Sequence, residues 1–207
     1  MAVSTTRTPR PRGAARREAL LDAVLRVVAD AGVDAVTHRR VAEVAALPLA
    51  STTYYFDSKE HLLTAALERA AERDIERLHA FLGDAPERAA DPLELAVAAI
   101  IDPYEAPPSG AADNPIPTSR SWLLATYVLL LEAARRPALR DVTVRWTDAY
   151  LEALPPLLAA AGSRHPRSDA ELLLAAADGL LVDQLASGDS SDLGPRLHRL
   201  ADALVKA

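Results

Sequence analysis

The chain has 207 residues, half of them apolar, a quarter charged and 4% aromatic, with a net charge of −6 at pH 7 and no cysteine. The absence of cysteine excludes a disulfide scaffold, a thiolate metal site and a cysteine nucleophile. No apolar run approaches the roughly 20 residues that span a bilayer, and no apolar stretch follows the basic N-terminus, so we expect a cytoplasmic protein without membrane contacts.

The N-terminal end is basic and lacks helical periodicity. Residues 1–13 mix Thr, Pro, Arg and Gly, which predicts a flexible arm. Residues 1–60 carry nine basic and seven acidic side chains, a net charge of +2, whereas the remainder of the chain carries −8. A basic end on an acidic body is typical of contact with nucleic acid, and the alternative is an arginine-rich disordered tail.

Apolar residues recur at helical spacing beyond the arm, and no segment alternates as a strand would. The predicted fold is therefore all-α, with about nine to ten helices. The helices are predicted at about 14–31, 38–45, 49–55, 59–83, 92–101, 119–135, 138–161, 169–187 and 194–205.

Several helix ends carry residues that cap helices or break them. The predicted N-caps are Thr37, Ser58 and Asp91, and Ser168-x-x-Glu171 reads as a capping box. Pro155-Pro156 is expected to interrupt its helix. The five prolines in 102–117 predict a long loop, which either forms a lid or lies on the surface.

The segment 37–55 has the layout of a helix-turn-helix, in which the second short helix reads DNA. Small or apolar residues occupy the positions where the two helices would cross, and side chains that bond base edges or phosphates occupy outward positions. The alternative is that the tyrosines of this segment pack inside a generic helical bundle. The candidate DNA-binding residues are Thr37, His38, Arg39, Ser51, Thr53, Tyr54, Tyr55 and Lys59.

The runs Val36–Ala45 and Ser51–Leu63 resemble the DNA-binding signature of the tetracycline-repressor (TetR) family of bacterial regulators. Thr53 and Tyr55 depart from the family's aromatic-Tyr-His-Phe-x-Ser-Lys-Glu core, where an aromatic residue and a histidine are usual. The resemblance covers about residues 14–63, and beyond them the chain is similar in helical architecture alone. The positions that match the core are Tyr54, Phe56, Ser58, Lys59 and Glu60.

The resemblance implies roles for residues and for larger segments. Thr37, Lys59 and the tyrosines would hold phosphates, whereas Ser51, Thr53 and Arg39 would approach bases. A DNA-binding domain over 14–60 would precede an effector-binding and dimerisation domain over 61–207.

The resemblance also implies a homodimer through the last two helices on a double-stranded DNA operator, because two recognition helices must meet successive major grooves. Leucines on more than one face of 169–187 allow a partner, and burial of both faces within the monomer is the alternative.

Aromatic residues mark a candidate effector site. Four of the nine in the chain fall within 122–150, namely Trp122, Tyr127, Trp146 and Tyr150. Trp146 and Tyr150 are four residues apart and so share a helix face. Apolar walls with a few polar tips are typical of small-molecule sites, and ordinary core packing is the alternative. Arg120 and Asp148 are possible polar contacts.

Patterns typical of catalysis, metal binding or cofactor binding do not occur in the sequence. The five histidines are dispersed, and there is no nucleophile elbow or glycine-rich nucleotide loop. We therefore predict no catalytic activity, no cofactor and no metal site. The predicted function is sequence-specific regulation of transcription by a repressor that a small-molecule effector releases. The alternatives are an activator, or a helical ligand-binding or interaction module without DNA binding.

Overall fold

The computed structural model describes residues 11–84, 91–105, 119–188 and 192–207, and every regular element in these ranges is a helix. The predicted all-α fold class is thus confirmed. In chain order the helices are α1 (Pro11–Ala31), a short 3-10 turn η1 (Val33–Ala35), α2 (His38–Val44), α3 (Leu49–Tyr55), α4 (Lys59–Gly83), α6 (Pro92–Glu105), α7 (Ser119–Glu132), α8 (Pro137–Ala160), α9 (Pro166–Ser187) and α10 (Gly194–Val205).

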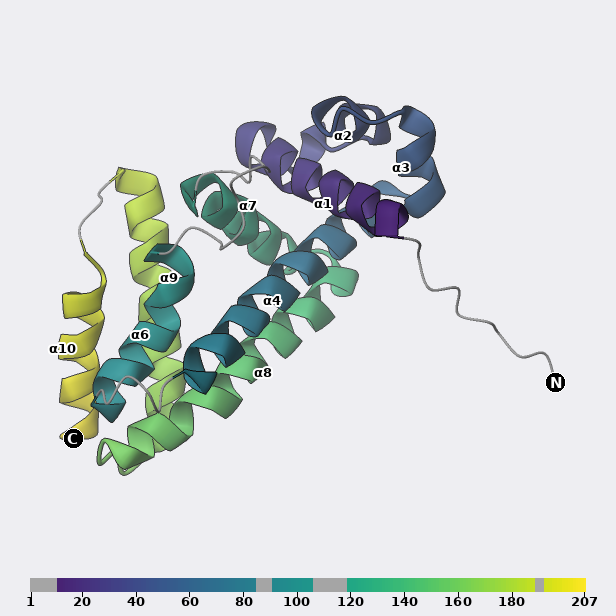
Figure 1. The fold of residues 1–207 in the computed structure, drawn as a ribbon. Coiled ribbons are helices and arrows are strands. Elements are labelled where there is room, and N and C mark those ends of the chain that lie inside the picture. Colours follow the sequence, from purple (N-terminus) through teal and green to yellow (C-terminus); the bar gives the residue numbers. More distant parts are fainter. Residues whose placement is uncertain (1–10, 85–90, 106–118, 189–191) are drawn as a thin grey trace.

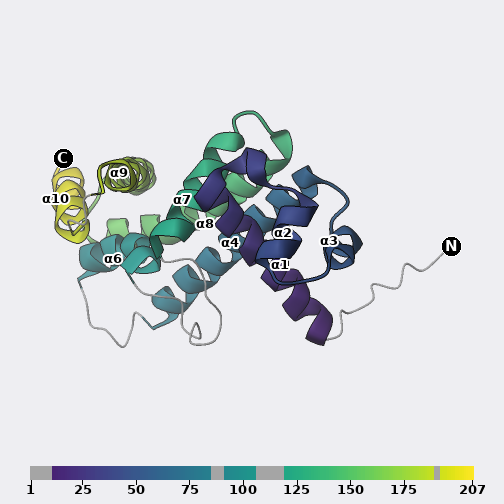
Figure 2. The same ribbon diagram turned by 90° about the horizontal axis from the view of Figure 1, so that it is seen from above.

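The helices divide into a head and a body. Helices α1, α2 and α3 gather at one end of the molecule, and α9 and α10 lie together at the opposite end (Figures 1 and 2). Helix α4 leaves the head and runs along α8 into the body (Figure 1). The head contacts the body through α1, which packs against both α4 and α7.

Buried apolar side chains connect the head to the body. One continuous cluster of buried apolar side chains extends from Leu20 in α1 to Ala201 in α10. Each fully buried leucine in such a cluster contributes roughly 1.5–3 kcal/mol to folding. The boundary predicted at residue 60 falls in the first turn of α4, so head and body share a helix, and their division into separate domains stays a prediction.

Ion pairs add to the junction between α1 and α4. Glu18 of α1 pairs with Arg69 and, at 3.3 Å, with Arg73. The buried carboxylate of Asp22 lies 2.7 Å from the guanidinium of the same Arg73. Two acidic residues of α1 thus engage two arginines of α4.

The predicted N-caps of α2, α4 and α6 are confirmed. The Thr37 hydroxyl accepts from the Arg40 amide at 3.1 Å, and the Ser58 hydroxyl accepts from the His61 amide at 3.1 Å. The Asp91 carboxylate accepts from the Leu93 amide at 2.7 Å. Each cap satisfies a backbone donor that the first helical turn leaves without a partner.

Two predictions are wrong, one about the start of α9 and one about an interruption within α8. The capping box at Ser168 does not open α9, which begins at Pro166, where proline loses nothing by lacking an amide hydrogen. Helix α8 continues through Pro155-Pro156, since the buried leucines on both sides of the pair, Leu154 and Leu158, hold the helix against the core.

Other boundaries differ by a few residues or lie outside the described ranges. Helix α1 begins at Pro11, three residues before its predicted start, so it includes the last three residues of the predicted arm. Residues 1–10 lie outside the described ranges. Helix α6 extends to Glu105, so residues 102–105 of the loop predicted over 102–117 are helical, and the rest of that segment lies outside the described residues. No helix in the described part of the chain is long and apolar enough to cross a membrane.

Candidate DNA interface and ligand pocket

The turn between α2 and α3 fixes the angle at which α3 leaves the head. Ala46 adopts a positive φ of 52°, and the amide of Leu47 donates to the carbonyl of Ala42 at 3.0 Å. Val41 and Ala42 are buried below the turn, and Thr52 is the fully buried residue of α3. The helix-turn-helix is therefore anchored by one face of each short helix, and the opposite face of α3 is free to meet a partner.

The exposed face of α3 carries two of the predicted DNA-binding residues. Thr53 is exposed, and Tyr54 is 80% exposed, which is unusual for an aromatic side chain. Ser51 lies half-buried beside them. Leu49, which the sequence analysis did not single out, is 50% exposed at the start of the helix. Apolar side chains are among the groups that contact thymine methyls in the major groove of DNA.

Tyr55 and Lys59 are tied to the head by their polar ends. The Tyr55 hydroxyl donates to the carbonyl of Gly13 in α1 at 3.1 Å, and its ring meets that of Tyr54 edge to face. The Lys59 ammonium donates to the carbonyl of Asp34 at 3.3 Å. The Tyr55 hydroxyl is thus held against α1, and the Lys59 ammonium against η1.

The remaining candidates lie at the start of α2. Thr37 is exposed although its oxygen serves as the N-cap, and Arg39 extends into solvent while pairing with Glu43 at 3.0 Å. His38 is half-buried, and its Nδ1 has no hydrogen-bond partner in the described structure. All eight predicted residues thus come from three neighbouring segments of the head: the start of α2, α3 and the first turn of α4.

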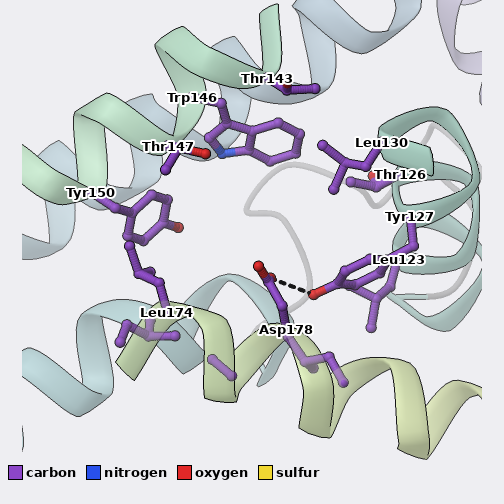
Figure 3. Close-up of a pocket in the computed structure, with 13 residues that line it drawn as sticks. Leu123, Thr126, Tyr127, Leu130, Thr143, Trp146, Thr147, Tyr150, Leu174 and Asp178 are labelled. Atoms are coloured by element: carbon purple, nitrogen blue, oxygen red, sulfur yellow. Dashed lines mark hydrogen bonds between the residues drawn. The ribbon is translucent and has the colours of Figure 1, made fainter. Parts of the chain in front are cut away.

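A cavity of about 120 Å³ lies among α7, α8 and α9 (Figure 3). Tyr127, Trp146 and Tyr150 are three of the four predicted aromatic residues, and they line it. The fourth, Trp122, is buried elsewhere, with the guanidinium of Arg77 at 5.3 Å from its ring centroid. The remaining lining residues are Ile100, Leu123, Thr126, Leu130, Thr143, Thr147, Leu174, Ala177, Asp178 and Leu181.

Trp146 and Tyr150 use their polar atoms to hold α4. Both the indole N–H and the phenol O–H donate to one carboxylate oxygen of Asp74, at 2.7 and 2.8 Å. The other oxygen lies 3.3 Å from Arg77. Asp74 is fully buried, and this desolvation raises its pKa against the opposing effects of Tyr150, Trp146 and Arg77.

A second carboxylate faces the cavity from α9. The Tyr127 hydroxyl donates to Asp178 at 2.8 Å, and the Asp178 side chain points toward the space between α7 and α8 (Figure 3). Desolvation raises the pKa of Asp178, and the hydrogen bond from Tyr127 opposes that rise.

Sequence reasoning missed both carboxylates. Asp74 lies 72 residues before Trp146, and no local pattern joins them, although Asp74 stands in the buried stripe of α4 between Ala70 and Leu78. A lone acid in an apolar stripe was the available signal. The two polar contacts considered instead lie outside the cavity lining: Arg120 donates to the carbonyl of Leu185, and Asp148 is exposed.

Two family models match the chain. Residues 20–66 match the one described as "Bacterial regulatory proteins, tetR family", and they cover most of the head. Residues 111–207 match the one described as "Tetracyclin repressor-like, C-terminal domain", and they include most of the cavity lining.

Among curated proteins, the HTH-type transcriptional regulator BetI of Rhizobium meliloti (strain 1021) is 48% identical over 52 residues. That alignment covers 25% of this chain and 26% of BetI, so the chain spans about a quarter of the length of this curated relative.

Solved structures match over nearly the whole chain. A transcriptional regulator from Rhodococcus sp. Rha1 has a TM-score of 0.77 at 21% identity, covering 91% of this chain and 95% of that one, which shows the fold. The multidrug binding protein EbrR, complexed with ethidium, has a TM-score of 0.64 at 31% identity, covering 91% of this chain and 97% of its own. At that identity and coverage the similarity extends to sequence as well as fold.

Proposed function

This chain belongs to the TetR family of bacterial DNA-binding regulators, and on that premise we propose that it is a homodimeric repressor released from its operator by a small-molecule effector. The observation that carries the proposal is the outward face of α3, where Thr53 and the 80%-exposed Tyr54 extend from a helix anchored by the buried Thr52. Such a face matches what a recognition helix offers to the major groove.

The proposed contacts divide into two kinds. Ser51 and Thr53 would meet base edges, with Arg39 at the flank, because short hydroxyls and a guanidinium bond to bases in the major groove. The other candidates would hold the DNA backbone, since hydroxyl, imidazole and ammonium groups bond phosphates without reading sequence. This second group comprises Thr37, His38, Tyr54, Tyr55 and Lys59.

A second copy of the chain would pack on α9 and α10. The leucine and alanine side chains Leu173, Ala177 and Leu181 are buried within the monomer, so the inner stripe of α9 is already used. A parallel stripe of small or apolar residues faces outward, where Leu172 and Val182 are 51% and 46% exposed. Ala175, Gly179 and Ala186 complete the outward stripe. An apolar stripe of this length supports a helix-to-helix contact with a partner.

The cavity is the proposed effector site. It is lined mainly by apolar and aromatic side chains with a few polar groups, as small-molecule sites are. The relative EbrR is described as a multidrug binding protein, which supports an organic molecule as the ligand of this chain as well.

The proposed transmission runs through α4 and α7. Trp146 and Tyr150 line the cavity and also hold Asp74 of α4, so a ligand that displaces either ring changes the contacts that position α4. Helix α7 carries Tyr127 at the cavity and packs against α1 of the head. An effector that favours the displaced arrangement would shift the dimer toward a state in which the two heads no longer fit successive major grooves.

Capture of genomic DNA fragments by the purified protein tests the proposal. We expect a near-palindromic operator, and the affinity for it should fall steeply with salt because phosphate contacts release counterions. Fluorescence anisotropy with the captured sequence and a scrambled duplex measures the difference. Equal affinity for both duplexes, or no binding to either, contradicts the proposal. A reporter gene behind the operator should be silenced, and activation would contradict repression.

A further inference from the structure

The cavity is electrostatically one-sided. Among the described residues that line the cavity, one is charged, Asp178, and none is basic. No described residue forms an ion pair with Asp178, whose hydrogen bond comes from the neutral phenol of Tyr127. Asp178 is exposed at one edge of the cavity, so a ligand that covers it would lower the effective dielectric constant around the carboxylate and strengthen its attraction to a cation.

The other polar group considered is the hydroxyl of Thr126. Thr126 is 3% exposed and lines the cavity, and its hydroxyl has no hydrogen-bond partner in the described structure. A buried hydroxyl without a partner costs free energy that a ligand could recover. Thr126 and Tyr127 are adjacent on α7, and both oxygens can accept hydrogen bonds from an N–H donor.

The walls of the cavity suit the rest of such a ligand. The polar atoms of Trp146 and Tyr150 are bound to Asp74, so their ring carbons remain to contact the ligand. Aromatic faces attract cations through the ring quadrupole. Leucine side chains from α7 and α9 close the remaining sides (Figure 3).

We infer that the cavity is selective for a small organic cation, an ammonium group attached to one ring or a short alkyl chain. Asp178 neutralises the charge, the hydroxyls of Thr126 and Tyr127 accept from the ammonium, and the aromatic rings surround the apolar part. The inference rests on the proposed function in that the same cavity is the effector site, and it adds the chemical class of the effector.

The size of the cavity limits the ligand. At about 120 Å³ it is slightly smaller than an engineered apolar cavity of about 150 Å³ that binds benzene. A single ring with a one-carbon ammonium arm is therefore the scale of ligand to test, with the ammonium placed at the mouth beside Asp178.

Benzylammonium is the test cation, and two analogues of similar shape serve as controls: benzyl alcohol, which is neutral, and benzoate, which is anionic. The chain contains two tryptophans, so Trp122→Phe leaves Trp146 in the cavity wall as the fluorescent reporter. We expect titration of the full-length protein at pH 7.5 to show binding of benzylammonium at least about tenfold tighter than benzyl alcohol, and no binding of benzoate.

The decisive variant is Asp178→Asn, which keeps an acceptor for Tyr127 and removes the charge. Its affinity for benzylammonium should fall about tenfold or more, while its affinity for benzyl alcohol stays the same. Asp148→Asn is the matched control, since it makes the same chemical change at an exposed position of α8 outside the cavity lining. Thermal unfolding of both variants verifies that they fold.

Each outcome separates the cation site from the proposed function. Equal affinity for benzylammonium and benzyl alcohol, an Asp178→Asn variant that binds like Asp148→Asn, or an unchanged Trp146 signal with every probe overturns the cation site. Operator binding is measured separately, without any probe, and it tests the proposed function independently of the cation site. Binding of benzylammonium that requires Asp178 supports the inference even where release from the operator needs a larger cation.

Discussion

Thr53 and Lys59 are expected to contribute to DNA binding in different ways. Thr53→Ala should relax preference at one operator position by about 1–3 kcal/mol, because it removes a contact to a base edge. Lys59→Ala should weaken binding to all duplexes alike and reduce the salt dependence by about one unit per protomer, because it removes a phosphate contact. Anisotropy titrations on operator and scrambled duplexes at several salt concentrations measure both effects.

The sequence contains one other lysine, Lys206, which provides a control. It is next to the C-terminal end of the chain, and that end lies far from the head (Figure 1). Lys206→Ala should leave affinity and salt dependence unchanged. If Thr53→Ala and Lys59→Ala reduce operator and scrambled binding by the same factor, the proposed division of roles is wrong.

The neighbouring tyrosines should respond differently to loss of their hydroxyls. Tyr54→Phe should leave stability unchanged and weaken operator binding, because its exposed ring has its hydroxyl free for a phosphate. Tyr55→Phe should also weaken operator binding, and in addition it should lower the free energy of unfolding by about 1 kcal/mol, because the hydroxyl donates to the carbonyl of Gly13. Urea unfolding and anisotropy on both variants make the comparison, and identical behaviour of the two would contradict it.

At the scale of elements, the contact between α4 and α8 depends on a single carboxylate. Asp74→Ala would remove the carboxylate that the indole of Trp146, the phenol of Tyr150 and the guanidinium of Arg77 all contact. We expect the free energy of unfolding to fall by about 3 kcal/mol or more, measured by urea denaturation. A loss below about 1 kcal/mol would show that the network does not hold the two helices together.

The pH dependence of the same contact has a definite sign. Burial raises the pKa of Asp74 in the folded state above its ordinary value of 3.8, so the folded protein binds this proton more tightly than the unfolded chain. Its contribution to stability is therefore greatest at acid pH and is lost as pH rises through the folded-state pKa. Asp74→Asn removes the titration, so wild type should lose stability relative to this variant as the pH rises above 3.8, the ordinary pKa of the group.

Urea denaturation at several pH values provides this difference, in which the titrations common to both proteins cancel. Asp148→Asn, on the surface of α8, is the control for replacing an aspartate elsewhere on the molecule. A constant difference between wild type and Asp74→Asn across the range would contradict the raised pKa.

At the scale of the whole molecule, the outward stripe of α9 is expected to hold the dimer together. Val182→Glu should place a charge in that contact, so the protein should change from twice the 22.1 kDa chain mass to a single chain mass. Operator affinity should fall with it, because one head contacts one half-site only. Light scattering after size-exclusion chromatography measures the mass.

Leu131→Glu is the matched control for that substitution, since Leu131 is 73% exposed and belongs to α7, which is not one of the two helices of the proposed interface. It should remain dimeric and bind operator normally. A dimer that survives Val182→Glu, or one that Leu131→Glu dissociates, would place the interface elsewhere.

Much of the architecture was available from local sequence signals. The predicted bounds of α3 and α10 agree with the structure, and the caps Thr37, Ser58 and Asp91 act as predicted, because propensity, capping and helical periodicity involve residues within a few positions of one another. The error at α8 arose where packing overrode a local signal, since Pro155-Pro156 lies between two buried leucines. The error at the start of α9 came from a competing local signal, the proline at position 166.

The sequence by itself determined that this chain is all-α, that its helix-turn-helix lies near the N-terminus, and that it resembles the TetR family, since each conclusion depends on residues close together in the chain. Only the tertiary structure decided that Trp146 and Tyr150 hold Asp74, that Trp122 lies outside the cavity, and that Asp178 enters it from α9. These contacts join residues about 50 to 80 positions apart in the sequence. The packing of helices brings them together, and the spacing of neighbouring residues does not predict that packing.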